Sequence, residues 1–441
     1  MEEGGLEWLL PEPGPREPLA LTDLEALMLY GAPPVPPALF CFRGMLDVQR
    51  LRESLGRVVS KNPAVAGRLR TLPRQGWLGA CRRRAQGDKR PGNVELHVEG
   101  AGGVPMHVKA MAAGLEAEVE KLCAEELARE PLKADVLFRK LGIEDVGNTR
   151  ELVDTDRPLL IATFVAGERT CVLSLSACHL LFDGWAYFEF LRCWEQEYLD
   201  PGSSEPLERP ARPSAVSELG HSIVRKTGAP PRCEDCYMLT ARFSEATLER
   251  IKLDMQVQAK RPPPERISRN DTLTAWLANV LGVSRVQLNA NFRGRGAPER
   301  YLGNAWCYLL ASPDAGPGRF DAADVRRSVE ACSQRVERVA CKYEDYYIVT
   351  SWTKVQHLPS FGAEMYASVF TRGDARHLLA SWTFGQQIIF QCQSGEYYTT
   401  YNGLSKERAA KLAAAWRDLG ETAVSVASFQ QLKDTLQPAV S

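Results

Sequence analysis

The middle of this 441-residue chain is interrupted by a segment that favours neither helices nor strands. Residues 200 to 231 begin Asp-Pro-Gly-Ser-Ser-Glu-Pro, contain several further prolines and lack regularly spaced apolar residues. Such a composition is typical of a linker or crossover. The chain is also longer than one hydrophobic core normally supports. We therefore expect an N-terminal lobe over residues 1–199, a crossover linker over 200–235 and a C-terminal lobe over 236–441.

Charge and composition restrict the functions that this chain can have. Apolar residues make up 44% of the sequence, which is enough for sizeable cores and is typical of a globular protein. The 54 lysines and arginines nearly balance the 55 aspartates and glutamates, and the formal net charge is -1. A chain without an overall positive field has no means to attract polyanions, so we expect no nucleic acid among its partners.

Two further features bear on the cellular compartment. The first residues lack the basic and then apolar order of a secretory signal. The most apolar stretch, residues 171 to 182, is shorter than the roughly 20 residues that a membrane-spanning helix needs. The 12 cysteines are scattered without the regular spacing of a disulfide scaffold. We therefore expect a cytoplasmic protein with no membrane span and with reduced thiols.

One cysteine pair has the spacing of metal ligands. Two residues separate Cys233 from Cys236, but a structural zinc site needs two further ligands at comparable spacing, and the neighbouring sequence offers none. The pair also follows a proline-rich loop, whereas a redox pair opens a helix after a strand. We favour two loop cysteines over a zinc or redox site.

The spacing of apolar residues predicts a mixture of helices and strands in both halves. In the first half we expect helices at residues 48–59 and 185–198, a hairpin formed by 93–99 and 105–109, and a buried strand pair at 159–165 and 170–177. In the second half we expect strands at 236–243, 284–289, 346–351, 388–393 and 397–401, and helices at 244–258, 270–281 and 405–419. Ser244 and Ser268 are plausible helix starts, because a hydroxyl there accepts hydrogen bonds from free backbone amides.

The most informative motif is Ser176-Ala177-Cys178-His179-Leu180-Leu181-Phe182-Asp183-Gly184-Trp185. A histidine ends a predicted buried strand, an acid follows four positions later, and a glycine precedes a predicted helix. A neutral imidazole, whose usual pKa is about 6.5, can take a proton from a hydroxyl or an amine, so His179 is a candidate general base. Taken alone, the pattern also fits a packed strand-end histidine, a solvated aspartate and a turn glycine.

The neighbourhood of this motif resembles the BAHD family of coenzyme A dependent acyltransferases. The motif itself matches the family's His-x-x-x-Asp-Gly signature, and Phe190, Leu191 and Trp194 follow where the family usually has a Phe-Leu and then a tryptophan. The other landmarks fall in the family's order and are Ala66-Gly67-Arg68-Leu69, residues 267–275, Arg293 with Tyr301-Leu302-Gly303-Asn304, and Thr350-Ser351-Trp352. The resemblance covers the chain from Pro18 to about Leu419.

One landmark departs from the family's pattern. Where the family has Asp-Phe-Gly-Trp-Gly, this chain has Ser360-Phe361-Gly362-Ala363-Glu364, so only Phe361 and Gly362 match. We interpret the chain as a member of a divergent branch, and no substrate of the family's plant enzymes is carried over to it.

The resemblance implies a fold and a reaction. The implied fold is α/β, with two similar lobes of mixed β-sheet flanked by helices, as in chloramphenicol acetyltransferase, and with the active-site channel between them. Acyl-coenzyme A is the implied co-substrate and a small-molecule alcohol or amine the acceptor, with no permanently bound cofactor and no metal. We expect a cytoplasmic monomer that acts in specialised metabolism.

The resemblance also assigns roles to individual residues. His179 is the implied general base in the middle of the channel. Asp183 is implied to turn away from it and to pair with Arg293, so that Asp183, Gly184 and Arg293 support the site. The candidates for lining the channel or binding the coenzyme are Trp185, Ser268, Asn304, Phe361 and Gly362. For Trp185, packing with Phe182 and Phe188 in the core is an equal alternative.

Two other features near the motif have simpler interpretations. A thiol beside a histidine suggests an acyl-enzyme on Cys178, but neighbours on a strand point to opposite faces, so we expect a buried packing cysteine. The basic run Arg82-Arg83-Arg84 with Lys89-Arg90 could meet the coenzyme phosphates, but a solvated loop is favoured.

Two alternative functions stay open. A condensation domain of the nonribosomal peptide type shares the two lobes, but it usually has two consecutive histidines where this chain has Cys178 and His179. A noncatalytic binding protein of the same fold is the other alternative. The altered segment at residues 360–364 suggests it, and the intact His179 argues against it.

Overall fold

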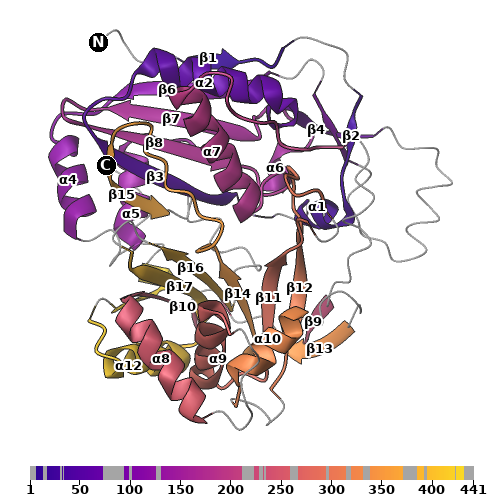
Figure 1. The fold of residues 1–441 in the computed structure, drawn as a ribbon, viewed down its shortest axis with the longest axis vertical. Coiled ribbons are helices and arrows are strands. Elements are labelled where there is room, and N and C mark those ends of the chain that lie inside the picture. The colour runs from indigo at the N-terminus through magenta and orange to yellow at the C-terminus, as the bar shows by residue number, and fades with distance from the viewer. Residues whose placement is uncertain are drawn as a thin grey trace.

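The computed structural model describes residues 6–12, 17–29, 32, 34–72, 94–98, 102–125, 131–210, 223–227, 232, 235–258, 267–294, 297–313, 319–330, 338–370, 385–391, 395–422 and 424–431. In this part of the chain, two large β-sheets with helices packed on them form two lobes, one above the other in Figure 1. The first half of the chain builds most of the upper lobe, and the second half builds the lower one.

The sheet of the first lobe contains six described strands in the order β1-β6-β7-β8-β3-β15. Its strands β6 and β7 run parallel, and the other neighbours run antiparallel, so the sheet is mixed. The strands are β1 (Leu6–Leu9), β6 (Val104–Ala110), β7 (Leu160–Ala166), β8 (Thr170–Ala177), β3 (Val35–Arg43) and β15 (Glu364–Phe370). Strands β7 and β8 are buried along their whole length, and the predicted buried strand pair is confirmed.

Helices cover both faces of this sheet, which explains why its central strands β7 and β8 are buried throughout. Side chains alternate along β3, where Phe40 and Phe42 belong to the core under α2 and α7, and Leu39 and Cys41 to the core under α4 and α5. The helices are α1 (Asp23–Met28), α2 (Val48–Lys61), α4 (Leu115–Glu125), α5 (Pro131–Lys140), α6 (Thr149–Leu152) and α7 (Gly184–Leu199), with a 3-10 turn at Pro63–Ala66.

The sheet of the second lobe contains seven described strands in the order β12-β11-β14-β16-β17-β10-β18, of which β11, β14 and β16 run parallel. The strands are β12 (Trp306–Ala311), β11 (Arg285–Asn291), β14 (Tyr346–Ser351), β16 (Gln386–Gln391), β17 (Tyr397–Leu404), β10 (Tyr237–Phe243) and β18 (Val424–Ser428). The helices are α8 (Glu245–Gln258), α9 (Arg269–Leu281), α10 (Ala322–Glu330) and α12 (Lys406–Asp418), with a 3-10 turn at Tyr343–Asp345. Each element predicted for this half overlaps one of them.

Strand β15 comes from the second half of the chain but pairs with β3 at the edge of the first sheet. The core of the first lobe likewise includes Trp306, Trp352 and Phe390 from the second half. The chain boundaries of the two lobes stay a prediction, and the sequence-based division does not include this exchange.

The hairpin predicted at residues 93–99 and 105–109 is wrong. Both segments contain strands, but β5 (Val94–His97) lies between β2 (Leu19–Ala20) and β4 (Arg68–Thr71) in a small separate sheet. Strand β6 instead pairs with β1 and β7. Alternating apolar residues predict that a segment is a strand but not which strand it pairs with. A further small sheet pairs β9 (Ile223–Thr227) with β13 (Arg338–Lys342).

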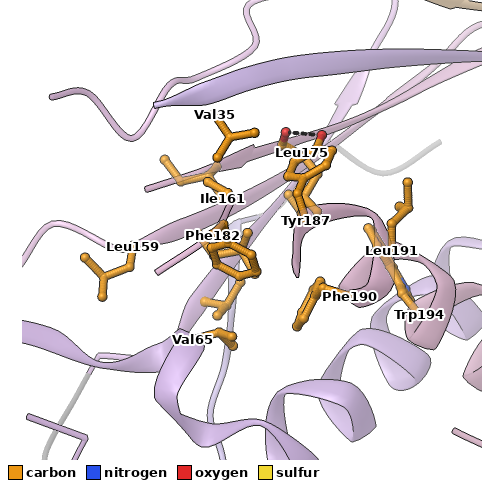
Figure 2. Close-up of a cluster of buried hydrophobic side chains, with 14 of the residues drawn as sticks. Val35, Val65, Leu159, Ile161, Leu175, Phe182, Tyr187, Phe190, Leu191 and Trp194 are labelled. Carbon is orange, nitrogen blue, oxygen red and sulfur yellow. Dashed lines mark hydrogen bonds between the residues drawn. The ribbon is translucent and has the colours of Figure 1, made fainter. Parts of the chain in front are cut away.

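Figure 2 shows the hydrophobic core between β8 and α7, which fixes the segment that joins them. The ring of Phe182, just before the start of α7, packs edge-on against Phe190 with ring centroids 5.7 Å apart. The hydroxyl of Tyr187 donates a hydrogen bond of 2.8 Å to the carbonyl of Leu175 on β8. The strand and the helix are therefore held on either side of the His179 segment.

Two properties of the described residues concern membranes and metals. No helix in these ranges is long and apolar enough to cross a lipid bilayer. No group of three or more histidine, cysteine or acidic side chains in the same ranges is placed to hold a metal ion. Cys236 is buried and its thiol donates to the Arg232 carbonyl at 3.2 Å, while Cys233 lies outside the described residues.

Candidate active site

The candidate site is built on the turn that connects β8 to α7. The strand ends at Ala177 and the helix begins at Gly184. At the base of the turn, the amide of Cys178 donates to the carbonyl of Leu159 at 2.8 Å, and the amide of Leu181 donates back to Cys178 at 3.1 Å. These bonds make a compact turn that projects from the end of a fully buried strand.

His179 occupies this turn and is partly exposed. Its Nδ1 atom is buried and forms no hydrogen bond with the described residues. Burial lowers the pKa of His179, and the opposing influences of Asp183 and Asn304 are smaller. A lowered pKa keeps the imidazole neutral at neutral pH, which is the form that can accept a proton.

Asn304 fixes the backbone of the turn. Its side-chain amide donates hydrogen bonds to the carbonyls of His179 at 2.7 Å and Leu180 at 2.6 Å. The indole Nε1 of Trp306 donates to Asn304 Oδ1 at 3.0 Å and so fixes the orientation of the amide. Asn304 was expected to line the channel or bind coenzyme, whereas in the structure its side chain holds the backbone of His179 and Leu180.

Asp183 points away from His179. One carboxylate oxygen caps α7 by accepting a hydrogen bond of 2.9 Å from the Ala186 amide. The carboxylate also accepts two hydrogen bonds from Arg293, at 2.8 and 3.0 Å, and one of 3.0 Å from the Ala305 amide. Asp183 and Arg293 are both buried, so this bidentate ion pair joins the first half of the chain to the second.

The other bonds of Arg293 hold the segment that contains Asn304. Its Nε donates to the carbonyl of Tyr301 at 3.0 Å, and its Nη2 donates to the carbonyl of Gly303 at 2.6 Å. The guanidinium lies over the ring of Trp185, with 4.2 Å from its central carbon to the ring centroid. Trp185 is partly buried and covers the ion pair, a contact that neither interpretation of this residue anticipated.

Gly184 is required by the close approach of Trp352, which follows β14 in the second half. A Cβ on Gly184 would lie 2.7 Å from the Nε1 atom and 2.9 Å from the Cε2 atom of the Trp352 indole. The indole cannot move aside easily, because it packs edge-on against Phe188 and Phe390 with centroids 5.7 and 5.1 Å away. The glycine therefore lets the second lobe contact the start of α7.

Cys178 is completely buried. Its sulfur lies 3.6 Å from the hydroxyl of Thr149. Burial raises the pKa of this thiol, which disfavours the thiolate that an acyl-enzyme mechanism needs. The geometry agrees with a packing role.

The altered segment at residues 360–364 docks on α7 instead of opening to a channel. Phe361 is only 2% exposed, and its ring packs edge-on against Trp194 and Tyr198 with centroids 5.5 and 5.3 Å away. Phe361 and Gly362 both have positive φ angles, of 49° and 75°, and form the tight turn that leads into β15. We correct the assignment of Phe361 as a channel residue, because its ring is buried in the core.

Glu195 on α7 binds this segment. One of its carboxylate oxygens accepts hydrogen bonds from the amide and the hydroxyl of Ser360, at 2.5 and 2.9 Å, and from the amide of Phe361 at 3.0 Å. The other oxygen lies 2.6 Å from His357 Nε2. Burial raises the pKa of Glu195, but these hydrogen bonds more than offset it and lower the pKa to about 2.

The remaining candidates from the sequence lie elsewhere. Ser268 caps α9, where its hydroxyl accepts a hydrogen bond of 3.2 Å from the amide of Asp271, and the carboxylate of Asp271 accepts one of 2.7 Å from the Ser268 amide. This capping box accounts for the Ser268 hydroxyl without a ligand. The basic residues Arg82-Arg83-Arg84 and Lys89-Arg90 lie outside the described residues.

Sequence reasoning missed Glu195 and a second buried pair beside the turn, Glu25 with Arg209. The signal for Glu25 was present, because Thr22 followed by an acid three residues later is a capping-box pattern. The signal for Glu195 was a charge on a face of α7 that apolar spacing predicts to be buried. Arg209 has no signal of its own, since it lies in the irregular crossover.

No protein-family model matches the chain, and no curated protein matches it in sequence. Vinorine synthase has a similar structure, with a TM-score of 0.63, 14% identity and coverage of 94% of this chain and 97% of that one. TRI101 from F. sporotrichioides, crystallised with coenzyme A and T-2, gives a TM-score of 0.61, 15% identity and coverage of 92% and 99%.

A nonribosomal peptide synthetase, FmoA3, is similar as well. The TM-score is 0.54 with 15% identity, and the match covers 99% of this chain but 47% of the synthetase. At these identities the likeness concerns the fold. The chain therefore has the two-lobed α/β fold of vinorine synthase and TRI101, and the fold class expected from the sequence is confirmed.

Proposed function

We propose that this protein is a divergent BAHD-type acyltransferase that moves an acyl group from acyl-coenzyme A to a hydroxyl or amine of a small molecule. The observation that carries the proposal is the turn after β8. A neutral, partly exposed His179 lies there on a backbone that Asn304 holds from the other half of the chain. The fold shared with TRI101, crystallised with coenzyme A and T-2, supports the choice of co-substrate.

In the proposed reaction His179 acts as the general base. The neutral imidazole takes the proton of the acceptor's hydroxyl or amine as the acceptor attacks the thioester carbonyl carbon. The tetrahedral oxyanion collapses, the carbon–sulfur bond breaks, and the coenzyme A thiolate takes the proton from the imidazolium. Base catalysis of this kind contributes about 10²- to 10⁴-fold to the rate. Asp183 and Arg293 support the turn and take no part in proton transfer.

A condensation reaction of the nonribosomal peptide type is the second candidate, and the similarity to FmoA3 is the observation that favours it. Such an enzyme takes its acyl group from a carrier-protein thioester. The buried Cys178, where these domains usually have a first histidine, argues for the coenzyme A dependent enzyme. The cytoplasmic location, the monomeric state and a place in specialised metabolism stay predictions.

The test is release of free thiol from a panel of acyl-coenzyme A donors with mixed alcohols and amines. We expect turnover by the wild-type protein and a loss of about 10²-fold or more in His179→Ala at an unchanged melting temperature. His97→Ala, which changes a histidine at the end of β5, is the matched control and should keep full activity. Retention of more than about a tenth of the turnover by His179→Ala would contradict the base assignment.

A further outcome separates the rival functions. Turnover only with acyl groups on a carrier protein would favour the condensation reaction. Binding of acyl-coenzyme A with no turnover of any acceptor would favour a noncatalytic binding protein. Trapping an acyl group on Cys178 would replace the base mechanism by an acyl-enzyme.

A further inference from the structure

A second buried ion pair lies beside the His179 turn, apart from that of Asp183 and Arg293. Glu25 belongs to α1, and Arg209 belongs to the crossover after α7. Their side chains are 0% and 4% exposed. Arg209 Nη1 donates to Glu25 Oε1 at 2.5 Å, and Nη2 donates to Oε2 at 2.9 Å, so the guanidinium and the carboxylate meet face to face.

The start of α1 fixes the direction of the Glu25 carboxylate. The amide of Thr22 donates to Glu25 Oε2 at 2.9 Å, and the amide of Glu25 donates to the hydroxyl of Thr22 at 3.1 Å. This reciprocal arrangement is a capping box. The remaining oxygen, Oε1, is therefore directed at the groups on its other side.

Those groups belong to the segment from Tyr301 to Asn304. Arg209 Nη1 donates to the carbonyl of Leu302 at 3.0 Å and to the hydroxyl of Tyr301 at 2.9 Å. That hydroxyl donates to Glu25 Oε1 at 3.2 Å, and the amide of Asn304 donates to the same oxygen at 3.4 Å. The ion pair thus holds the segment through a side chain, a carbonyl and an amide.

Gly303 shows how closely the segment is pressed onto the pair. Its φ angle is 153°, and a Cβ there would lie 2.5 Å from Arg209 Nη1. Its carbonyl accepts the hydrogen bond from Arg293 on the other side. The segment therefore lies between two buried arginines, each paired with an acid from the first half of the chain.

Asn304 connects this segment to the proposed base. The backbone of Asn304 contacts Glu25, and its side chain donates to the carbonyls of His179 and Leu180. Because the side chain starts from that backbone, a shift of the segment changes where the amide meets the turn. Displacements of about 1 Å at a catalytic group can cost about 10²-fold in rate.

We propose that Glu25 and Arg209 are positioning residues for His179, and that they act by holding Asn304 against the turn. This inference rests on the proposed function. Neither residue touches His179, and their effect on the reaction passes through Asn304. The pair also stabilises the fold, so its test needs a readout that loss of stability alone does not move.

The matched pair of variants is Glu25→Gln and Glu197→Gln. Glu197 is also 0% exposed and binds two cations, Arg57 at 2.9 Å and Lys61 at 2.5 Å, but it lies at the far end of α7 from His179. Each substitution removes one buried negative charge with the same change of shape. We expect comparable falls in melting temperature in the two variants.

The kinetic readout should separate them. In Glu25→Gln we expect kcat to fall by about tenfold or more, while KM for the acyl donor stays within about twofold. The acidic limb of the pH profile of kcat/KM should also move to lower pH, because the contact with Asn304 raises the pKa of His179. In Glu197→Gln both kcat and the profile should match the wild type. Equal effects in the two variants, at equal melting temperatures, overturn the positioning role.

A measurement without turnover keeps this inference separate from the proposed function. The chain has six histidines, so the imidazole of His179 can be followed by NMR of histidine-labelled protein and assigned with His179→Ala. If the His179 pKa differs from the wild-type value in Glu25→Gln but not in Glu197→Gln, the positioning role of Glu25 is supported, even if the wild type transfers no acyl group. An undisplaced titration in Glu25→Gln, with an active wild type, overturns positioning and leaves the function standing.

Tyr301→Phe tests the same positioning role if Glu25→Gln does not fold. This variant removes only the hydroxyl that joins Tyr301 to Glu25 and Arg209, and it keeps both charges. We expect kcat to fall by about threefold. The pKa of His179 should shift in the same direction as in Glu25→Gln. No change in either quantity overturns the proposal.

Discussion

Asp183, at the start of helix α7, and Glu195, within it, are two of the buried acids that bind the second half of the chain, and the two differ in what lies beside them. Asp183 caps the start of the helix and binds Arg293 and Ala305. Glu195 lies 12 residues later, about 18 Å along the helix, and binds Ser360 and Phe361. We call these two contacts joints, because each connects α7 to the second half of the chain. In both, a buried acid accepts several hydrogen bonds, but only the joint at Asp183 lies next to the His179 turn.

The difference shows that the same kind of contact, a buried carboxylate with several donors, can have two different roles in one protein. At Glu195 the hydrogen bonds dock the segment that leads into β15 on the first lobe. At Asp183 the same kind of contact also fixes the end of the turn that carries the proposed base. A change at Glu195 should therefore weaken the fold alone, and a change at Asp183 should weaken the fold and the reaction together.

The largest effect is expected from Asp183→Ala. The substitution leaves the Arg293 charge buried without its partner, which costs about 3 to 5 kcal/mol, and it removes the cap of α7 as well. The free energy of unfolding in urea measures this loss. Thiol release at a temperature where the variant is folded should fall by more than tenfold, about the scale of a misplaced catalytic group.

Glu195→Ala is the matched control for that comparison. It leaves the buried amides of Ser360 and Phe361 without an acceptor, at about 1 to 3 kcal/mol for each unsatisfied group. Turnover per folded molecule should nevertheless stay within about threefold of the wild type. If it falls as far as in Asp183→Ala, the two joints do not differ in function and α7 acts as one unit.

The pH dependence of stability tests the contacts of Glu195. The pKa of Glu195 is about 2 in the folded protein and near 4.5 when the chain is unfolded. Because the folded value is the lower one, the stabilisation is fully present above about pH 4.5 and is lost as the pH falls towards 2. The difference corresponds to about 3 kcal/mol.

Urea unfolding of the wild type and of Glu195→Gln between pH 6 and pH 2.5 checks this expectation. The wild type should lose stability along this range more steeply than the variant, which lacks the titrating group. Parallel pH dependence in the two proteins would show that Glu195 is not held in its ionised form by His357, Ser360 and Phe361.

Gly184→Ala should have a moderate effect, because it tests the contact of Trp352 with the start of α7. The added methyl would overlap an indole that is itself enclosed by aromatic rings, and overpacking of this kind costs about 1 to 3 kcal/mol. Gly56→Ala on α2 is the control, since apart from the neighbouring backbone of its own helix no atom lies within 4 Å of its Cβ position. That variant should be more stable by about 0.5 to 1 kcal/mol.

A second substitution makes the test sharper. Trp352→Phe shortens the ring system and should partly rescue Gly184→Ala, whereas it should not add to the stability of Gly56→Ala. The free energies of unfolding of the wild type, Gly184→Ala, Trp352→Phe and their double variant give the coupling directly. Additive effects at Gly184 and Trp352 would contradict the contact.

The sequence predicted five strands and three helices of the second lobe and the buried strand pair that carries His179, because their apolar spacing is regular, but it did not predict β12, α10 or β18. It did not predict the pairing of β5 with β2 and β4, or the exchange of β15 into the first sheet. Strand pairing depends on contacts between distant segments, and neither period nor propensity carries that information.

The candidate site shows the same limit at the level of single residues. The motif led to His179, Asp183 and Gly184, since their order along the chain is also their order around the turn. The partners that give these residues their positions come from elsewhere, such as Trp352 and Asn304 from the second half. Phe361 was misassigned, because a matching residue type in a landmark does not show whether its ring faces a channel or a core.

The smallest effect is expected at Trp185, whose ring lies under the Arg293 guanidinium. Trp185→Phe keeps an aromatic face there and Trp185→Leu does not, so Leu should be the less stable variant by about 1 to 2 kcal/mol, the scale of a desolvated cation–π contact. This order opposes helix propensity, in which Leu exceeds Phe, so intrinsic preference cannot produce it.

Unfolding in urea and the preference among small and bulky acceptors should be measured on both variants. Equal losses of about 3 to 5 kcal/mol would assign Trp185 to the core, and a changed acceptor preference at wild-type stability would assign it to the channel. The expected result, a modest loss in Leu with unchanged preference, would instead place Trp185 with Asp183 and Arg293 as the cover of the joint beside His179.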